Sequence, residues 1–145
     1  MPEHSESRDY LVLSRGQWDA AASQQDVQAA IEAFYIWYEQ SVAAGLMKPG
    51  HRLAREGKVV SRRSMTDGPF AEAKELVGGY WFIVAPNLEA AAALATQNPC
   101  LAYGLTLEVR PLELARADVT VSANETPAQW GARKWAKPAE ALSAR

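Results

Sequence analysis

The order of apolar and polar positions along the chain predicts an alternation of strands and helices. Residues 10–13 form a compact apolar run after a polar leader, which is typical of a strand. Between residues 23 and 45 apolar side chains recur every three or four positions, which places them on one stripe of a helix. Ser23 or Asp26 suits its N-cap, and Gly45 suits its C′ position.

The next stretch has a less regular pattern. Residues 46–64 indicate two short strands or an irregular hairpin around a polar turn at residues 55–58. Residues 66–69, Thr-Asp-Gly-Pro, are dense in turn-forming residues. Residues 70–76 have the composition of one or two helical turns.

The strongest strand signal is the aromatic and β-branched run at residues 80–84, which follows two glycines. Residues 88–97 are rich in alanine and predict a helix with Asn87 as its N-cap. Residues 104–112 predict a last strand, because Leu105, Leu107 and Val109 alternate with Thr106, Glu108 and Arg110.

This order predicts an α+β fold: a ferredoxin-like split β-α-β sheet with two helices on one face. In the run at residues 80–84, Tyr80, Phe82 and Val84 point to one face, and Trp81 and Ile83 point to the other. Both faces of the strand are therefore apolar, while the helices cover one of them. A second copy of the chain is the economical cover for the other face, so we expect a homodimer.

Length and composition narrow the class of protein. With 145 residues, one domain is the default: a polar leader at residues 1–9, the domain at residues 10–113, and an extension at residues 114–145 that we expect to pack on the domain or its partner. A net charge of -2 does not support nucleic-acid binding. The chain has one cysteine, no signal-like leader and no membrane-length apolar stretch, so we expect a cytoplasmic protein without membrane contact.

A sequence motif adds a family resemblance. Residues 65–75, Met-Thr-Asp-Gly-Pro-Phe-Ala-Glu-Ala-Lys-Glu, followed by Gly-Gly-Tyr at 78–80, resemble the signature of the YCII-related superfamily and its DGPF subgroup. The resemblance implies a dimeric α+β barrel, in which two ferredoxin-like sheets pack face to face around a cavity. The chain departs from the pattern at Met65, at residues 62–64 and in its extension.

Asp67 is the first candidate catalytic residue. A carboxylate at the rim of an apolar cavity can have a raised pKa and act as a general acid or base. Asp before Gly-Pro is also ordinary turn chemistry, in which the side chain binds nearby backbone N–H groups. The resemblance implies a site that pairs a His with an Asp, which puts the two interpretations of Asp67 on an equal footing.

His51 is the second candidate, since imidazole carries protons near neutral pH. It matches no histidine position of the family, and a surface or loop histidine is the competing interpretation. The sequence shows no cluster of His, Cys and Asp with metal-ligand spacing, so we expect neither a metal nor a cofactor.

Three further residues are candidates for ligand binding. Glu108 and Arg110 share one strand face, and if Leu107 and Val109 pack on the helices, these charges face the dimer cavity. Arg110 would then bind a carboxylate or enolate, whereas the competing interpretation is an ion pair within the sheet. Trp81 would stack on a flat ligand in the cavity or, alternatively, form part of the dimer core.

Two functions from different classes follow. One is a cofactor-independent enzyme that performs acid–base chemistry on a small aromatic or carboxylated molecule in the dimer cavity. The other is a non-catalytic ligand-binding or regulatory module, which the resemblance links to extracytoplasmic-function sigma factors in bacteria. No signal for a phosphate loop, a catalytic triad or a dinucleotide site is present.

Overall fold

The computed structural model describes residues 7–68, 76–121 and 123–132. The chain forms two compact units, residues 1–112 and residues 113–145. The helical turns predicted at residues 70–76 lie almost entirely outside the described residues.

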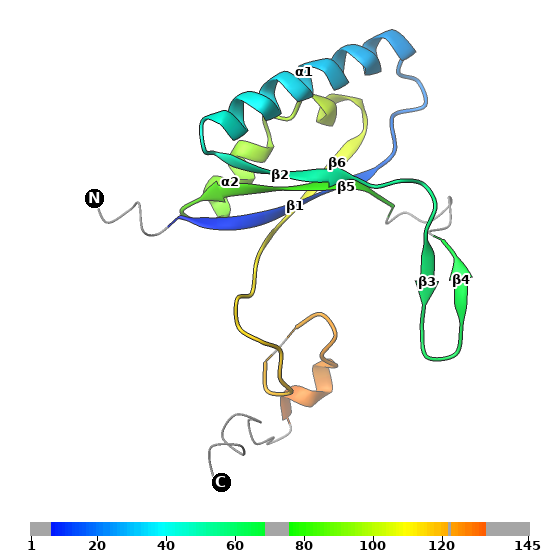
Figure 1. Ribbon diagram of the computed structural model, residues 1–145, viewed down its shortest axis with the longest axis vertical. Coiled ribbons are helices and arrows are strands. Elements are labelled where there is room, and N and C mark those ends of the chain that lie inside the picture. The colour runs from blue at the N-terminus through cyan, green and yellow to red at the C-terminus, as the bar shows by residue number, and fades with distance from the viewer. Residues whose placement is uncertain (1–6, 69–75, 122, 133–145) are drawn as a thin grey trace. The chain divides into compact units, whose positions relative to one another are not determined.

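The first unit is built on a four-stranded antiparallel sheet in the order β2-β5-β1-β6. Its strands are β1 (Arg8–Gly16), β2 (Met47–Arg52), β5 (Val77–Ala85) and β6 (Leu105–Pro111). Helices α1 (Gln24–Ala43) and α2 (Leu88–Ala95) both lie on one side of the sheet (Figure 1). A 3-10 helix, η2 (Pro99–Tyr103), precedes β6 and was not predicted. The strand order and helix placement confirm the ferredoxin-like α+β fold.

The helix ends form at the predicted capping residues. The Ser23 hydroxyl accepts a hydrogen bond from the Asp26 N–H, and the Asn87 side chain accepts one from the Ala90 N–H. Gly45 has a φ of +80°, a left-handed conformation that glycine adopts without a Cβ penalty. Local chemistry therefore determines where these two helices begin and where α1 ends.

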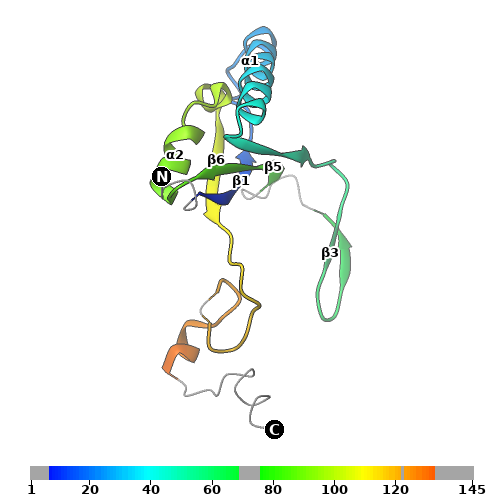
Figure 2. The same cartoon turned by 60° about the vertical axis from the view of Figure 1, so that its left-hand side comes forward.

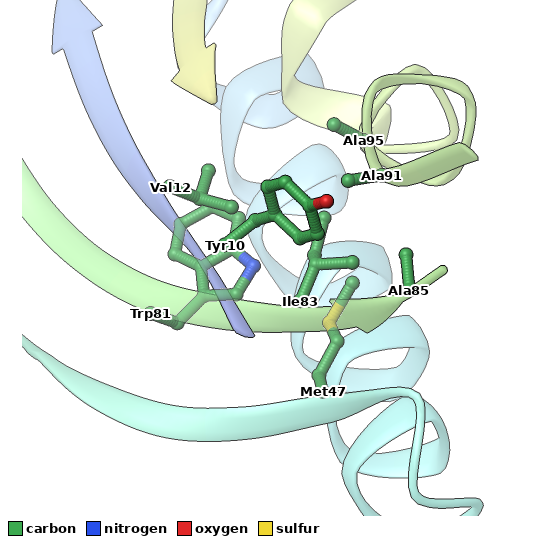
Figure 3. Close-up of a cluster of buried hydrophobic side chains, with 8 residues drawn as sticks. All are labelled: Tyr10, Val12, Met47, Trp81, Ile83, Ala85, Ala91 and Ala95. Carbon is green, nitrogen blue, oxygen red and sulfur yellow. The ribbon is translucent and has the colours of Figure 1, made fainter. Parts of the chain in front are cut away.

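The core lies between the sheet and its helices. Figure 3 shows its eight buried side chains: Tyr10, Val12, Met47, Trp81, Ile83, Ala85, Ala91 and Ala95. Leu107 and Val109 of β6 pack against this cluster. The alternate residues of each strand therefore point to the uncovered side.

The segment between β2 and β5 differs from the prediction. Strands β3 (Lys58–Val60) and β4 (Met65–Asp67) form a separate two-stranded sheet, which we call the arm (residues 58–67). The arm stands away from the four-stranded sheet in two views (Figures 1 and 2). The chain reverses at residues 61–64, not at 55–58, and Thr66 and Asp67 belong to a strand where a turn was predicted.

The second unit contains a 3-10 helix, η3 (Ala128–Ala132). Asp118 organises a turn before it, because its carboxylate accepts hydrogen bonds from the Thr120 N–H and hydroxyl. In the described parts of both units, no helix has the length and apolar character needed to cross a membrane.

Candidate ligand-binding site on the open face of the sheet

The sheet face without helices, here called the open face, carries two rows of side chains that run across all four strands. The strand register places His51, Tyr80, Leu13 and Glu108 in one row. The neighbouring row is Lys48, Phe82, Leu11 and Arg110. The two rows make an apolar floor of four side chains with two polar side chains at each edge.

A β-bulge in β2 brings Lys48 and His51 to the same face. Residues three apart on a regular strand point to opposite faces, yet these two pair with Phe82 and Tyr80, which are two apart. Gly50 lies in the bulge, where an added Cβ would come within 2.0 Å of the Tyr80 carbonyl oxygen. The Gly50 N–H donates a hydrogen bond to the Tyr38 hydroxyl of α1 at 3.1 Å. The bulge therefore requires a residue without a side chain at position 50, and a hydrogen bond to α1 holds it in place.

The floor of the site is aromatic on the β2 side. The His51 ring lies edge-on to Tyr80 with ring centroids 6.2 Å apart. Tyr80 lies edge-on to Phe82 at 6.1 Å. Leu11 and Leu13 continue the floor on β1, and all four floor side chains are half-buried. Such a surface favours contact with a flat apolar group.

Ion pairs border the floor on both sides. Lys48 of β2 reaches Asp9 of β1 at 2.9 Å. On the other side, Glu108 pairs with Arg110 at 3.3 Å and with Arg15 at 3.5 Å. The predicted placement of Glu108 and Arg110 on the uncovered face is therefore confirmed, together with an ion pair within the sheet. Among the described residues, two guanidinium groups therefore share one carboxylate at this edge.

Sequence reasoning missed Arg15, Lys48 and Tyr80 as members of this site. Arg15 follows Leu11 and Leu13 at a spacing of two, so strand alternation was the one sequence pattern that could have placed it on the same face. Lys48 has no such signal, because its face depends on the bulge.

The structure corrects the face assigned to Trp81. Its side chain lies in the helix-covered core, with ring centroids 5.3 Å from Phe34 and 6.0 Å from Tyr38. Both faces of β5 are apolar, so the alternation could not show which one the helices cover. Both predicted roles of Trp81, stacking on a ligand in the dimer cavity and forming part of the dimer core, were therefore wrong, because the ring is buried in the core of its own chain.

Asp67 lies at the end of the arm, not on the floor. Its side chain is 87% exposed and forms an ion pair with Lys58 of the facing strand at 2.5 Å. No described contact joins it to His51 or Arg110. The structure therefore brings together His51, Glu108 and Arg110 on one face and leaves Asp67 apart from them.

The remaining chemistry is limited within the described residues. They contain no group of three His, Cys, Asp or Glu side chains arranged to hold a metal ion. Cys100 is buried, and its thiol lies 3.6 Å from the Ala30 carbonyl oxygen, to which it donates. Burial raises the pKa of the Cys100 thiol, so the thiol stays protonated at neutral pH.

These features define a ferredoxin-like domain whose uncovered sheet face carries an apolar floor with charged edges. The family model described as the YCII-related domain matches residues 9–114, and the chain belongs to this family. No curated protein matches the chain.

Proposed function

We propose that the protein binds a small, flat, anionic molecule on its open face, of the aromatic carboxylate class. The observation that carries the proposal is the register, which places the aromatic pair Tyr80 and Phe82 two strands away from the arginine-bearing edge of the same face. An aromatic ring would lie on the floor, and the carboxylate would face the guanidinium groups.

The arginine side chains beside Glu108 support an anion over a cation. Arg15 and Arg110 both lie within ion-pair distance of Glu108, so two guanidinium groups are gathered at one end of the face. A guanidinium group binds a carboxylate through two parallel hydrogen bonds, which gives both affinity and orientation. Glu108 would hold the two arginine side chains in place for that contact.

A second copy of the chain would close the site. The floor residues are half-buried in one chain, and the helices cover the opposite face. Packing two open faces together would remove the apolar floor from water while the charged edges stay at the rim. The ligand would then lie in a cavity between two sheets, as the family resemblance implies.

Acid–base catalysis is the second candidate, and the contact between His51 and Tyr80 favours it. This contact places an imidazole at the edge of the floor, where a bound ligand would lie within its reach. Asp67 would take part only if the arm of one copy approached the site. The link to extracytoplasmic-function sigma factors and the DGPF subgroup stay predictions from the sequence motif.

The test is a titration of the full chain with benzoate and with uncharged benzamide, followed by NMR of the His51 ring and by calorimetry. We expect benzoate to bind more tightly than benzamide. Arg110→Ala is expected to weaken benzoate binding by about tenfold, the loss of one charge-assisted hydrogen-bond pair. Arg8→Ala is the matched control, because Arg8 is an exposed arginine of β1 whose register partner is Ala85 of the core. Equal binding of the two probes, or no binding of benzoate at millimolar concentration, would overturn the proposal.

A further inference from the structure

Positive and negative charges are separated between two parts of the first unit. Residues 48–63 carry six basic side chains and one acidic side chain, Glu56, in a protein whose net charge is -2. The six are Lys48, Arg52, Arg55, Lys58, Arg62 and Arg63. By contrast, helix α1 carries Asp26, Glu32 and Glu39 and has no Lys or Arg.

The arm contains three of these basic side chains beside exposed apolar side chains, and one of the three, Lys58, forms an ion pair within the arm. Val60 and Met65 face each other across the two strands, and each is 67% exposed. Arg62 and Arg63 lie in the turn beside them, and neither forms an ion pair among the described residues. A two-stranded hairpin is at best marginally stable in water by itself, so a surface that covers it would stabilise it.

The outer surface of α1 has the opposite character. Glu32, Ile36 and Glu39 are spaced at four and three residues, which places them on one exposed stripe of the helix. Ile36 is 59% exposed. In the described part of the chain, neither Glu32 nor Glu39 forms an ion pair. The stripe therefore consists of an exposed apolar side chain between two carboxylates.

We infer that the arm of one chain docks on the outer stripe of α1 of a second copy. Val60 and Met65 would cover Ile36, while Arg62 and Arg63 would pair with Glu32 and Glu39. Both surfaces belong to the same chain, and no described contact joins them within it. This contact is separate from the open face, so the inference does not depend on the proposed ligand site.

A nucleic acid is the competing partner for a basic hairpin. Phosphate groups would pair with Arg62 and Arg63 but would leave Val60 and Met65 in water. The negative charge of the nucleic acid would also repel the acidic side chains of α1. The stripe on α1 offers both carboxylates and an apolar side chain. The complementarity of charge and apolar surface together favours the second copy.

Cross-linking of the full chain tests the contact directly. Met65→Cys and a tagged Ile36→Cys variant are mixed under oxidising conditions, and the mixed disulfide is measured by intact mass. Leu88→Cys replaces Ile36→Cys as the control, because Leu88 is also exposed but begins α2. We expect mixed disulfide to form several times faster with Ile36→Cys, and this difference to be lost in about 1 M salt, where the Debye length is about 3 Å.

Charge exchange provides the second arm of the test. Adding Arg62→Glu and Arg63→Glu to the Met65→Cys chain is expected to abolish the excess cross-linking. Adding Glu32→Arg and Glu39→Arg to the Ile36→Cys chain reverses the charge of the stripe as well. The excess cross-linking is then expected to return when this chain is mixed with the Met65→Cys chain whose arm carries the two glutamates. All four substituted side chains are exposed, so the fold is preserved. Cross-linking equal to the Leu88→Cys control, or arm-dependent binding of a DNA duplex by the wild-type chain, would overturn the inference. A failure here leaves benzoate binding unaffected, and the reverse is also true.

Discussion

His51 and Glu108 lie at opposite ends of one row of side chains that crosses the whole sheet, with Tyr80 and Leu13 between them. Three strand spacings separate the two ends, a distance of about 14 Å. The imidazole and the carboxylate therefore cannot exchange a proton directly within one chain. The row instead separates a histidine-bearing edge from an arginine-bearing edge, an arrangement suited to a ligand that lies along the floor.

The open face should hold two chains together. Phe82→Glu would place a charge in the centre of the apolar floor, and burying an unpaired charge in an interface is strongly unfavourable. We expect light scattering in about 1 M salt, where the contact between the arm and α1 is screened, to give twice the 15.8 kDa chain mass for the wild type and the single-chain mass for the variant. Leu88→Glu, an exposed position on α2, should leave the mass unchanged. A wild-type protein that is already monomeric would contradict the dimer.

Trp81 should contribute to stability because it lies in the core. Trp81→Ala removes a buried ring that packs on Phe34 and Tyr38, and such truncations cost about 3–5 kcal/mol. Urea unfolding should show this loss, with a clearly smaller one for Trp18→Ala, whose side chain is 36% exposed. Similar losses for both variants would show that Trp81 is not a core residue.

The bulge in β2 should tolerate no side chain at Gly50. Gly50→Ala would drive a Cβ into the Tyr80 carbonyl, so the strands must separate locally. We expect the free energy of unfolding to fall by more than about 2 kcal/mol and the His51 NMR signal to change. Gly78→Ala is the matched control, because its new Cβ would meet Ser14 at an ordinary 3.9 Å. Equal stability of the two variants would contradict the role assigned to the bulge.

Asp67 should matter little to stability. Its ion pair with Lys58 is exposed, and such pairs contribute about 0–1 kcal/mol. Asp67→Asn and Lys58→Gln are therefore expected to unfold within about 1 kcal/mol of the wild type and to bind benzoate equally well. Loss of binding or turnover in Asp67→Asn, at unchanged stability, would return Asp67 to the functional site.

Stability should fall in alkali partly because of Cys100. Burial raises the pKa of its thiol in the folded protein, so above the ordinary thiol pKa of about 8.5 the unfolded chain loses a proton that the folded chain keeps. This difference favours the unfolded state increasingly as pH rises toward the raised folded pKa. We expect Cys100→Ala to show a smaller alkaline loss in the free energy of unfolding than the wild type. Parallel pH profiles would contradict the assignment.

Local patterns were sufficient to predict the main elements of the first unit. Capping side chains at Ser23 and Asn87 determine the helix starts, because they satisfy backbone N–H groups that the helix itself cannot. Alternation in β6 placed Glu108 and Arg110 on the face opposite Leu107, as the structure confirms. The signature at residues 65–75 indicated the family, which the match over residues 9–114 shows.

Tertiary structure decided the composition of the site. The sequence by itself determined that β5 is apolar on both faces, but the packing of α1 and α2 decided that Trp81 is core and Tyr80 is floor. The sequence analysis assigned no role to Gly50, and its close approach to Tyr80 in the structure accounts for the bulge that brings Lys48 and His51 together. Such pairings depend on long-range contacts between strands, which local periodicity does not encode.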